Sequence, residues 1–426
     1  MYKISNTEDG IEIFLPEDNT ICNFNDTTWE IIKTIKNSKS INESIKIVAK
    51  KFKISAEDAK EDIQTVLSNL KKLKIDIDKI PLETKYRLYQ PRNVHFDITS
   101  KCNSNCIYCI SSDLMKDQKE LAIQDILGTI KQLEDLGMWI LTLSGGEPLL
   151  RDDIFDILDY TKKQGILVNI LTNGLVIDDS ISKKLKKYKL LTKIQVSLDS
   201  YNPEHHEKHR GVKGCFKKTM EGINSLLKYD INPIISCVVT KINVGDIEKT
   251  IDFLNTIGIK RLRIAPASFF SEKTKLNKEE ILLDKQQLES LGKKVVSLSE
   301  KYKSMEFSIS PVLLSYKKDT KYIPDILYCT VGQSILYLSA SGDVYPCNGL
   351  IFPEFKIGNI NNKSIKELWL KSDILRRFRK LDVNDFNKCK NCDLKENCNG
   401  GCRGNAYRIF KSVTEYDPVY CAYFDR

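Results

Sequence analysis

The chain has 426 residues, 41% of them hydrophobic and 29% charged, with a formal net charge of +9. This length exceeds a typical single domain and predicts two or three domains. No apolar run approaches the roughly 20 residues that span a bilayer, and the N-terminus lacks a signal-peptide pattern, so we expect a cytoplasmic protein with no membrane partner. Thirteen cysteines in such a chain favour bound metal clusters over a disulfide framework.

Residues 1–80 are predicted to form a small separate unit. Alternating runs predict strands over 2–5, 11–15 and 20–24. Three helices are expected next, each marked by a hydroxyl residue three positions ahead of an acid, which is the capping-box pattern. The pairs are Thr27 with Glu30, Ser40 with Glu43, and Ser55 with Asp58. Strands followed by three helices suggest a winged-helix unit that binds either DNA or a peptide.

Charge separates these two interpretations. Residues 1–80 hold thirteen lysines, no arginine and fourteen acidic residues, a net charge of −1, so the basic footprint of a DNA-binding module is missing. The stretch 25–63 instead resembles the winged-helix domain that recognises leader peptides in ribosomal peptide maturation. The resemblance implies that an extended leader peptide adds as a strand to the sheet edge. A dimerisation or docking module is the alternative.

A linker bounded by Pro81 and Pro91 leads into a strand–helix alternation that runs to about residue 265. Repeated strand–helix units predict a parallel sheet that closes into a barrel or partial barrel, with ligands at the C-terminal ends of its strands. A further helical pattern covers residues 272–305. The predicted strands are 94–99, 139–143, 167–172, 193–198, 234–239 and 261–265, and helices 118–136, 152–164 and 216–229 lie between them.

Three cysteines directly follow the first of these strands. Cys102, Cys106 and Cys109 have the spacing CxxxCxxC, with Tyr108 just before the last thiol. Three thiolates on one tight loop can hold three irons of a [4Fe–4S] cluster and leave the fourth iron free. A zinc loop is the alternative, but it needs a fourth ligand, and the nearest histidine is His95 on the preceding strand.

This loop resembles the signature of the radical S-adenosylmethionine (radical SAM) superfamily. The resemblance implies a partial (β/α)6 barrel and a cluster whose free iron binds SAM. Gly145-Gly-Glu-Pro148, after the second strand, matches the family segment that binds the amino group of SAM, and small residues there let the backbone approach a ligand. The expected SAM-binding residues are Tyr108, Gly145, Gly146, Glu147, Pro148, Asn173, Ser197, Asp199 and Arg210.

Two parts of this pocket have specific expected roles. Ser197 and Asp199, at the end of the fourth strand, are assigned to the ribose side by the resemblance. Arg210 matches an arginine that pairs with the SAM carboxylate, a task that suits a guanidinium because it can donate two parallel hydrogen bonds. A solvated loop charge is the alternative for Arg210, and turn chemistry is the alternative for Asn173. The histidines at 205, 206 and 209 are interpreted as loop residues and not as metal ligands.

The last third of the chain contains seven more cysteines in the pattern C-x12-G-x4-C, gap, C-x2-C-x5-C-x3-C, gap, C. The pattern resembles the SPASM domain, which carries two auxiliary [4Fe–4S] clusters, for a total of three clusters. A zinc ribbon is the alternative for four of these cysteines. The resemblance assigns Cys329, Cys347 and Cys402 to an inner cluster, and Cys389, Cys392, Cys398 and Cys421 to an outer cluster.

The inner set has three thiols, so we expect one open iron there that takes a substrate thiolate, unless an aspartate or a backbone group closes it. Cys22, Cys215 and Cys237 are interpreted as structural residues. The expected domains are 1–80 for leader recognition, 91–305 for the radical SAM barrel and 306–426 for SPASM.

Together these patterns predict an enzyme that installs a thioether in a ribosomally made precursor peptide. A 5′-deoxyadenosyl radical would abstract hydrogen, a peptide cysteine would bind the inner cluster, and flavodoxin or ferredoxin would supply electrons, with no catalytic residue expected beyond the SAM cluster. Carbon–carbon crosslinking or another side-chain oxidation is the alternative. Sulfatase maturation is disfavoured, because Asn348 stands where those relatives carry an aspartate base. A cluster-based redox regulator is the non-enzymatic alternative, and no nucleic-acid partner is expected.

Overall fold

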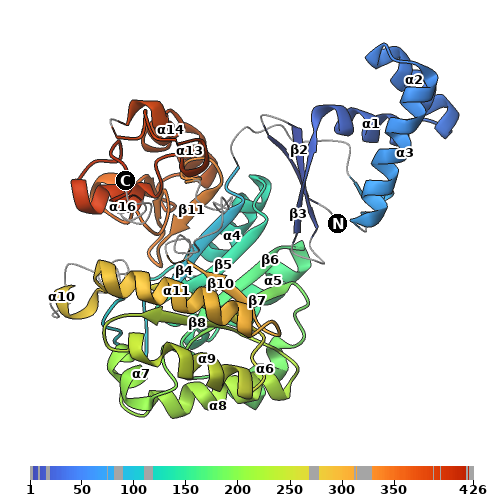
Figure 1. The fold of residues 1–426 in the computed structure, drawn as a ribbon. Helices are drawn as coiled ribbons and strands as arrows, with labels where there is room; N and C mark the ends of the chain where they lie inside the picture. Colours follow the sequence, from blue (N-terminus) through green and yellow to red (C-terminus); the bar gives the residue numbers. More distant parts are fainter. Residues whose placement is uncertain are drawn as a thin grey trace. The chain divides into compact units, whose positions relative to one another are not determined.

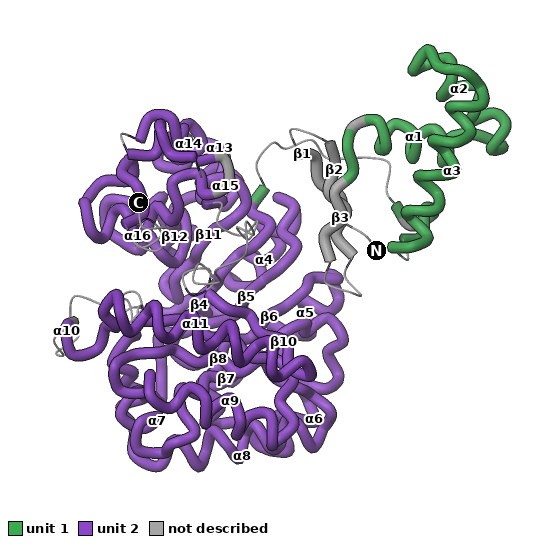
Figure 2. The backbone as a smooth tube through the Cα atoms, in the orientation of Figure 1, with its two compact units in different colours: residues 1–90 green, residues 91–426 purple. Residues whose placement is uncertain are grey.

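The structure is a computed structural model in which the chain divides into two compact units, residues 1–90 and residues 91–426 (Figure 2). It describes residues 3–7, 10–15, 20–73, 75–80, 90–109, 119–267, 278–310, 313, 329–386, 388–393, 395–418 and 421. Most of the predicted linker therefore lies outside the described residues. Among the described helices, none combines the length and apolar character that a membrane-spanning segment requires.

The first unit consists of an antiparallel sheet in the order β1-β2-β3 and three helices. Its core is formed by apolar residues of the helices, among them the fully buried Ile32, Val48 and Ile63. This arrangement agrees with the predicted order of strands and helices. The elements are β1 (Lys3–Thr7), β2 (Gly10–Leu15), β3 (Thr20–Asn25), α1 (Asp26–Asn37), α2 (Ile41–Phe52) and α3 (Ala56–Lys72).

Two of the three predicted helix caps are confirmed. The Ser40 and Ser55 side chains accept hydrogen bonds from backbone N–H groups three residues later, at 3.2 and 3.0 Å. The cap predicted at Thr27 is wrong, because helix α1 begins at Asp26 and Asn25 caps it by accepting from the backbone N–H of Thr28. An asparagine is as good a cap as a hydroxyl residue, so the capping-box pattern alone misplaced this start.

The second unit contains one large sheet and the helices that cover it (Figure 1). Its strands are β4 (Asn93–Thr99), β5 (Ile140–Gly145), β6 (Leu167–Thr172), β7 (Leu191–Ser197), β8 (Ile234–Val239), β9 (Arg261–Pro266), β10 (Glu306–Ile309), β11 (Ile335–Leu338), β12 (Asp343–Tyr345) and β13 (Gly358–Asn359). Its helices are α4 (Ile123–Asp135), α5 (Ile154–Gln164), α6 (Asp179–Leu185), α7 (Pro203–Arg210), α8 (Cys215–Lys228), α9 (Ile247–Thr256), α10 (Lys278–Ile281), α11 (Lys285–Lys301), α13 (Ile365–Lys371), α14 (Asp373–Arg379), α15 (Lys395–Cys398) and α16 (Arg403–Phe410).

The strand order is β10-β9-β8-β7-β6-β5-β4-β11-β12-β13. Strands β4 to β10 are parallel, as predicted, and each predicted strand coincides with an observed one to within two residues. The C-terminal strand β11 pairs in parallel with β4, with Tyr337 beside His95, and continues the same sheet. The C-terminal third is therefore joined to the first strand of the partial barrel by backbone hydrogen bonds.

The two faces of this sheet differ in polarity. On β4, Val94, Phe96 and Ile98 are fully buried on the face that the helices cover, whereas His95 and Asp97 alternate with them on the opposite face. Most cross-strand neighbours on that opposite face, from β5 to β7, are polar and half-buried, although Leu171 is apolar. In register with β4 they include Thr142, Ser144, Asn169, Gln195 and Ser197. The inner face therefore has the polar, partly accessible character of a binding surface.

Candidate active site

The cysteine loop after β4 is fixed to the end of helix α7. The backbone N–H groups of Asn105 and Ile107 donate to the carbonyl oxygens of Arg210 and His209, at 2.9 and 3.0 Å. Cys102 is exposed and Cys106 is half-buried. The structure thus presents these thiols at the C-terminal end of the first barrel strand, where ligands gather in folds of this kind.

The two glycines after β5 are required by this loop. A Cβ atom on Gly145 would lie 2.1 Å from the carbonyl oxygen of Thr99, and one on Gly146 would lie 2.0 Å from that of Lys101. The N–H groups of Gly146 and Glu147 donate to the same two oxygens, each at 2.8 Å. The glycines therefore let the second strand pack against the backbone of the cysteine loop, a reason different from the approach to a ligand inferred from the sequence.

Glu147 directly follows, and its carboxylate is completely buried. It accepts hydrogen bonds from the Thr172 hydroxyl (2.8 Å) and from the backbone N–H groups of Leu149 (3.1 Å) and Asn173 (2.7 Å). Burial raises the pKa of Glu147 to about 7, although these hydrogen bonds oppose the rise. Such a carboxylate favours a cationic partner, because a bound cation would offset the cost of burying its charge. Pro148, next in the chain, is also buried.

Asn173 links Glu147 to the cysteine loop. Its side-chain amide donates to the Asn103 side chain at 2.6 Å and to the Ser104 hydroxyl at 3.2 Å. Its side-chain oxygen also accepts from the backbone N–H of Leu175 at 2.9 Å, which is the turn chemistry considered as the alternative. Asn173 therefore makes the expected turn and also holds the loop that bears the cysteines.

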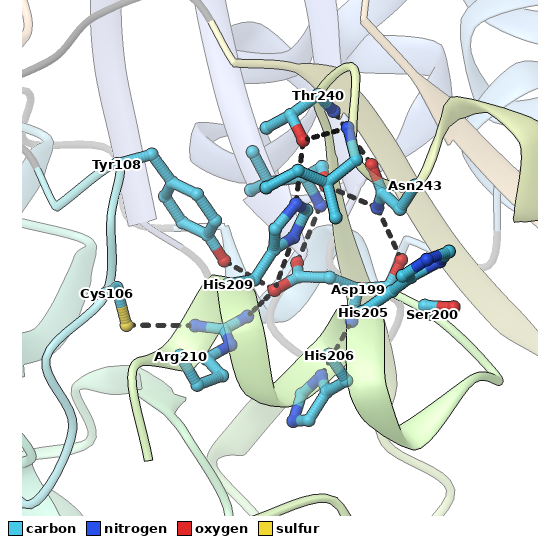
Figure 3. Close-up of polar contacts among 12 residues, drawn as sticks. Cys106, Tyr108, Asp199, Ser200, His205, His206, His209, Arg210, Thr240 and Asn243 are labelled. Atoms are coloured by element: carbon cyan, nitrogen blue, oxygen red, sulfur yellow. Dashed lines mark hydrogen bonds and ion pairs between the residues drawn. The ribbon is translucent and has the colours of Figure 1, made fainter. Parts of the chain in front are cut away.

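Asp199 and Arg210 form the centre of the second group of polar contacts (Figure 3). One Asp199 oxygen (Oδ2) accepts from the Tyr108 hydroxyl at 2.6 Å, lies 2.9 Å from Arg210 Nη2 and lies 3.4 Å from His209 Nδ1. Its other oxygen accepts from the backbone N–H of Val238 at 3.0 Å. Burial alone would raise the pKa of Asp199, but Arg210 and His209 outweigh it and hold this pKa well below its usual range. Asp199 is therefore an ionised, fully engaged carboxylate.

Arg210 connects this centre to the cysteine loop. Its Nη1 donates to Cys106 Sγ at 3.6 Å, while Nη2 faces Asp199. The residue is 7% exposed, so the alternative of a solvated loop charge is wrong. Its buried Nε has no hydrogen-bond partner within the described part of the chain. Ser197 ends strand β7, two residues before Asp199, and is half-buried.

The interpretation of His205, His206 and His209 as loop residues is wrong, because all three lie on helix α7. Asn202 caps this helix, and a proline occupies its first turn. An asparagine followed by proline is a typical helix start, and this signal in the sequence was overlooked. His206 and His209, three residues apart, share the buried face of the helix, and burial lowers the pKa of His206 to about 3.

Glu120 is a further residue that the sequence analysis missed. Its carboxylate accepts hydrogen bonds from the Thr99 and Ser100 hydroxyls and from the Ser100 backbone N–H, each at 2.8 Å. It thereby holds the segment between β4 and the first cysteine. No sequence motif distinguishes this glutamate, since its partners are 20 and 21 residues away.

The C-terminal cysteines fall into two groups in the structure. Burial raises the pKa of the Cys347 thiol, and the neighbouring Cys402 and Cys329 raise it further, so these three thiols are close together. Burial likewise raises the pKa of Cys402 to about 11, again with Cys329 nearby. These three cysteines are the set that the sequence analysis assigned to the inner cluster.

The other group contains four thiols. Burial raises the pKa of Cys398 to about 12, and Cys421, Cys389 and Cys392 add to that rise. Burial raises the pKa of Cys421 to about 11, where Cys389 and Cys392 again contribute. The structure thus brings together the four cysteines predicted for the outer cluster. Cys215 and Cys237 are buried, as structural residues would be, and the side chain of Cys22 lies outside the described residues.

Asp417 lies between these two groups. Its carboxylate accepts from the backbone N–H of Cys402 at 2.8 Å and from the Asn405 side chain at 2.9 Å. It also contributes to the raised pKa values of Cys398 and Cys402. Both Asp417 oxygens accept hydrogen bonds from Cys402 or Asn405, so this carboxylate is engaged by the protein next to the inner group.

The donor chemistry fits iron–sulfur clusters and SAM. Thiols are the usual ligands of such clusters, and the cluster itself would separate them, which differs from a site for a single ion. Among the residues that the structure describes, no three His, Cys, Asp or Glu side chains converge on one ion position. The unpartnered Arg210 Nε suits the carboxylate end of an amino-acid ligand.

Comparison with known proteins gives the class of this protein. Residues 96–254 match the radical SAM superfamily, and residues 329–393 match the SPASM iron–sulfur cluster-binding domain. The chain therefore has the radical SAM fold with a C-terminal SPASM domain, and it is an enzyme.

Two curated relatives are similar over most of their length. The AdoMet-dependent heme synthase of Methanosarcina barkeri is 29% identical over 351 residues, which cover 78% of this chain and 97% of that protein. The PqqA peptide cyclase of Rhizobium meliloti is 26% identical over 335 residues, which cover 78% of this chain and 88% of that protein. One relative is thus named for heme synthesis and the other for the cyclisation of a peptide.

Solved structures share the fold. Streptococcus suis SuiB bound to its precursor peptide SuiA has a TM-score of 0.73 at 18% identity and covers 98% of both chains. The structure of anSMEcpe with bound AdoMet has a TM-score of 0.63 at 22% identity and covers 78% of this chain and 96% of that one. The match to SuiB extends over both units, whereas the match to anSMEcpe covers a smaller share of this chain.

Proposed function

We propose that this enzyme forms a thioether between a cysteine sulfur and a carbon atom in a ribosomally made precursor peptide. The observation that carries the proposal is the inner group of Cys329, Cys347 and Cys402, which has three thiols where the outer group has four. A [4Fe–4S] cluster held by three thiolates keeps one iron for another ligand. A cysteine of the peptide is the ligand that places sulfur where the new bond must form.

The SAM site is proposed at the first cysteine loop. Cys102, Cys106 and Cys109 would hold the cluster, the segment Gly145–Pro148 would bind the SAM amino group and Arg210 would bind its carboxylate through Nε. Bound there, the cluster and SAM would supply one-electron chemistry that removes a hydrogen atom from an unactivated carbon. Asn173 and Glu120 hold the loop in place, and the polar inner face of the sheet offers a surface for the peptide.

The peptide substrate is supported by two further features. The first unit is a small antiparallel sheet with β1 and β3 as its outer strands, to which an extended leader peptide can add by backbone hydrogen bonding. The comparisons also include a PqqA peptide cyclase and SuiB with its precursor peptide. We propose that residues 1–80 bind the leader while the modified part of the peptide reaches the second unit.

The test uses the full chain with its clusters reconstituted under anaerobic conditions. With SAM and dithionite, we expect 5′-deoxyadenosine to form, and a short cysteine-containing peptide encoded beside the gene should lose two hydrogens and one alkylatable thiol. A variant with Cys102, Cys106 and Cys109 replaced by alanine is the control for both signals. Modified peptide in which every thiol is still alkylated would contradict thioether formation.

Carbon–carbon crosslinking is the second candidate, and the similarity to PqqA peptide cyclases favours it. It also removes two hydrogens from the peptide, so mass alone does not separate the two reactions. Alkylation does, because a carbon–carbon product keeps its full number of thiols. Fragmentation of the product then identifies the joined residues.

A further inference from the structure

The carboxylate at the centre of the proposed SAM site, Asp199, has no solvent-accessible surface. The Asp199 side chain is 0% exposed, and both of its oxygens are engaged by protein groups. A group in that position cannot contact the ribose of a nucleoside unless the surrounding residues move. Its contacts therefore suggest a role different from the direct one inferred from the family resemblance.

We propose that Asp199 is a positioning residue that acts through Arg210, holding the guanidinium against Cys106 and toward the SAM carboxylate. The inference rests on the proposed assignment of Arg210 to that carboxylate. The guanidinium is planar and its N–H groups point in fixed directions. Once Asp199 holds Nη2 at 2.9 Å, Nη1 faces the Cys106 sulfur and Nε remains for an anion.

The hydrogen bonds around His209 support this arrangement. The Thr240 hydroxyl accepts from the backbone N–H of Ile242 at 3.1 Å and lies 2.7 Å from His209 Nε2, so these contacts fix the imidazole ring. The other ring nitrogen, Nδ1, lies 3.4 Å from the Asp199 carboxylate. The histidine therefore encloses the carboxylate together with Tyr108 and Arg210.

Tyr108 extends the effect of Asp199 to the cysteine loop. The tyrosine lies between Cys106 and Cys109, and its hydroxyl donates to the carboxylate that also pairs with Arg210. The Arg210 guanidinium lies 5.5 Å from the centre of the tyrosine ring. Asp199 therefore ties both the loop and the guanidinium to the end of β7, and Figure 3 shows these groups converging on it.

The experiment compares two ligands that share adenosine but differ in the carboxylate. Binding of SAM and of 5′-methylthioadenosine is measured by anaerobic equilibrium dialysis on the reconstituted wild type, Asp199→Asn and Arg210→Gln. We expect Asp199→Asn to weaken the binding of SAM by about tenfold, which corresponds to the loss of one charge-assisted contact. The affinity for 5′-methylthioadenosine should be unchanged. The double variant should lose no more SAM affinity than Arg210→Gln alone, because both changes remove one coupled unit.

A second readout is the reduction potential of the SAM-responsive cluster, followed by EPR. Arg210→Gln should shift this potential in the negative direction, because a cation near a thiolate ligand favours the reduced cluster. Asp199→Asn should shift it in the positive direction, because it removes a negative charge and leaves the Arg210 cation beside Cys106. If Asp199→Asn instead lost affinity equally for SAM and for 5′-methylthioadenosine, Asp199 would be a ribose ligand. If it lost affinity for neither, Asp199 would have no role in SAM binding. Both results overturn the proposal.

Iron content and circular dichroism establish whether Asp199→Asn folds and holds its clusters. If it does not, Tyr108→Phe provides the test, because it removes one contact to Asp199 and leaves the carboxylate in place. The affinity of that variant for SAM should fall by less than that of Asp199→Asn, and its affinity for 5′-methylthioadenosine should be unchanged. No peptide is present in these measurements, so their failure is distinct from a failure to form the thioether.

Discussion

The cysteine loop at residues 102–109 and the C-terminal cysteines at 329–421 have different surroundings. The loop is held by polar contacts. The backbone N–H of Glu147 donates to the Lys101 carbonyl, the Asn173 side chain donates to Asn103, and Arg210 donates to Cys106 Sγ. The C-terminal thiols lie among apolar residues: Cys347 packs in the cluster that includes Leu350 and Phe355. The difference shows that polar contacts fix the first cysteine loop, whereas apolar packing surrounds Cys347.

The C-terminal region also contains a contrast of its own. Cys389 lies in a second, smaller apolar cluster with Val383 and Phe386, separate from the one that holds Cys347. Asp417 is placed between the two thiol groups. Four thiols can bind all four irons of a [4Fe–4S] cluster, whereas three thiols leave one iron without a protein thiolate. Both groups have apolar surroundings, so the number of thiols distinguishes them.

The largest effect should come from removing one thiol in each region. Cys106→Ala should abolish 5′-deoxyadenosine formation, because the SAM site loses a ligand and the contact to Arg210. Cys392→Ala, in the outer group, should retain SAM cleavage while it loses peptide product. Chromatography of nucleoside and peptide products gives both readouts. SAM cleavage that disappears in Cys392→Ala, with the SAM cluster still present by EPR, would contradict the division of roles.

A matched pair of glycines sharpens the comparison. Gly146→Ala places a methyl group against the Lys101 carbonyl, so the cysteine loop must shift, and we expect a loss of about four irons per chain. Gly349→Ala beside Cys347 should leave the iron content unchanged, because its new methyl group would meet that sulfur at an ordinary 3.6 Å. Iron analysis after reconstitution tests both. Equal iron contents in the two variants would contradict the account of the loop.

Arg403 tests the C-terminal region alone. Its buried guanidinium donates to the carbonyl oxygens of Gly400, Gly401, Val413 and Glu415. Arg403→Met leaves these oxygens unpaired and should lower the free energy of unfolding by about 3 kcal/mol. Arg376→Met, at an exposed site on α14, is the control and should change it by less than about 0.5 kcal/mol. Denaturant titration measures both, and equal effects would contradict the role of Arg403.

The smallest expected effect is a pH dependence of the free energy of unfolding that is caused by Glu147. Its pKa is about 7 in the folded protein, above its ordinary value of 4.5, so protonation favours the folded state and this contribution is lost as pH rises toward 7. Relative to Glu147→Gln, the SAM-free wild type should lose about 2 kcal/mol of stability between about pH 5.5 and 8. Urea denaturation at the two pH values measures this. A constant difference between the two proteins would contradict the raised pKa.

The sequence predicted the parallel sheet well, for physical reasons. Buried strands such as Leu167–Thr172 have short apolar runs, and this local pattern predicts a strand without knowledge of the tertiary structure. Helix α7 was missed because its residues, with three histidines and a lysine, have little apolar periodicity, and its cap Asn202 is its main local signal. Side-chain partners far apart in sequence, such as Tyr108 with Asp199, leave no local pattern.

The pairing of β11 with β4 could also not be predicted from the sequence. Strand β11 has four residues and pairs with a strand from the beginning of the second unit, so no local pattern reveals its neighbour. The same applies to Asp417, one of many aspartates until its contact with Cys402 is seen.

Iron analysis combined with EPR, on the anaerobically reconstituted full chain, tests the central claim most directly. The account predicts about twelve irons per chain and a change in one cluster signal when dithiothreitol is added, with that change absent in Cys402→Ala. Fewer irons than this, or cluster signals that ignore the added thiol in the wild-type protein, would contradict an inner cluster that is open to sulfur.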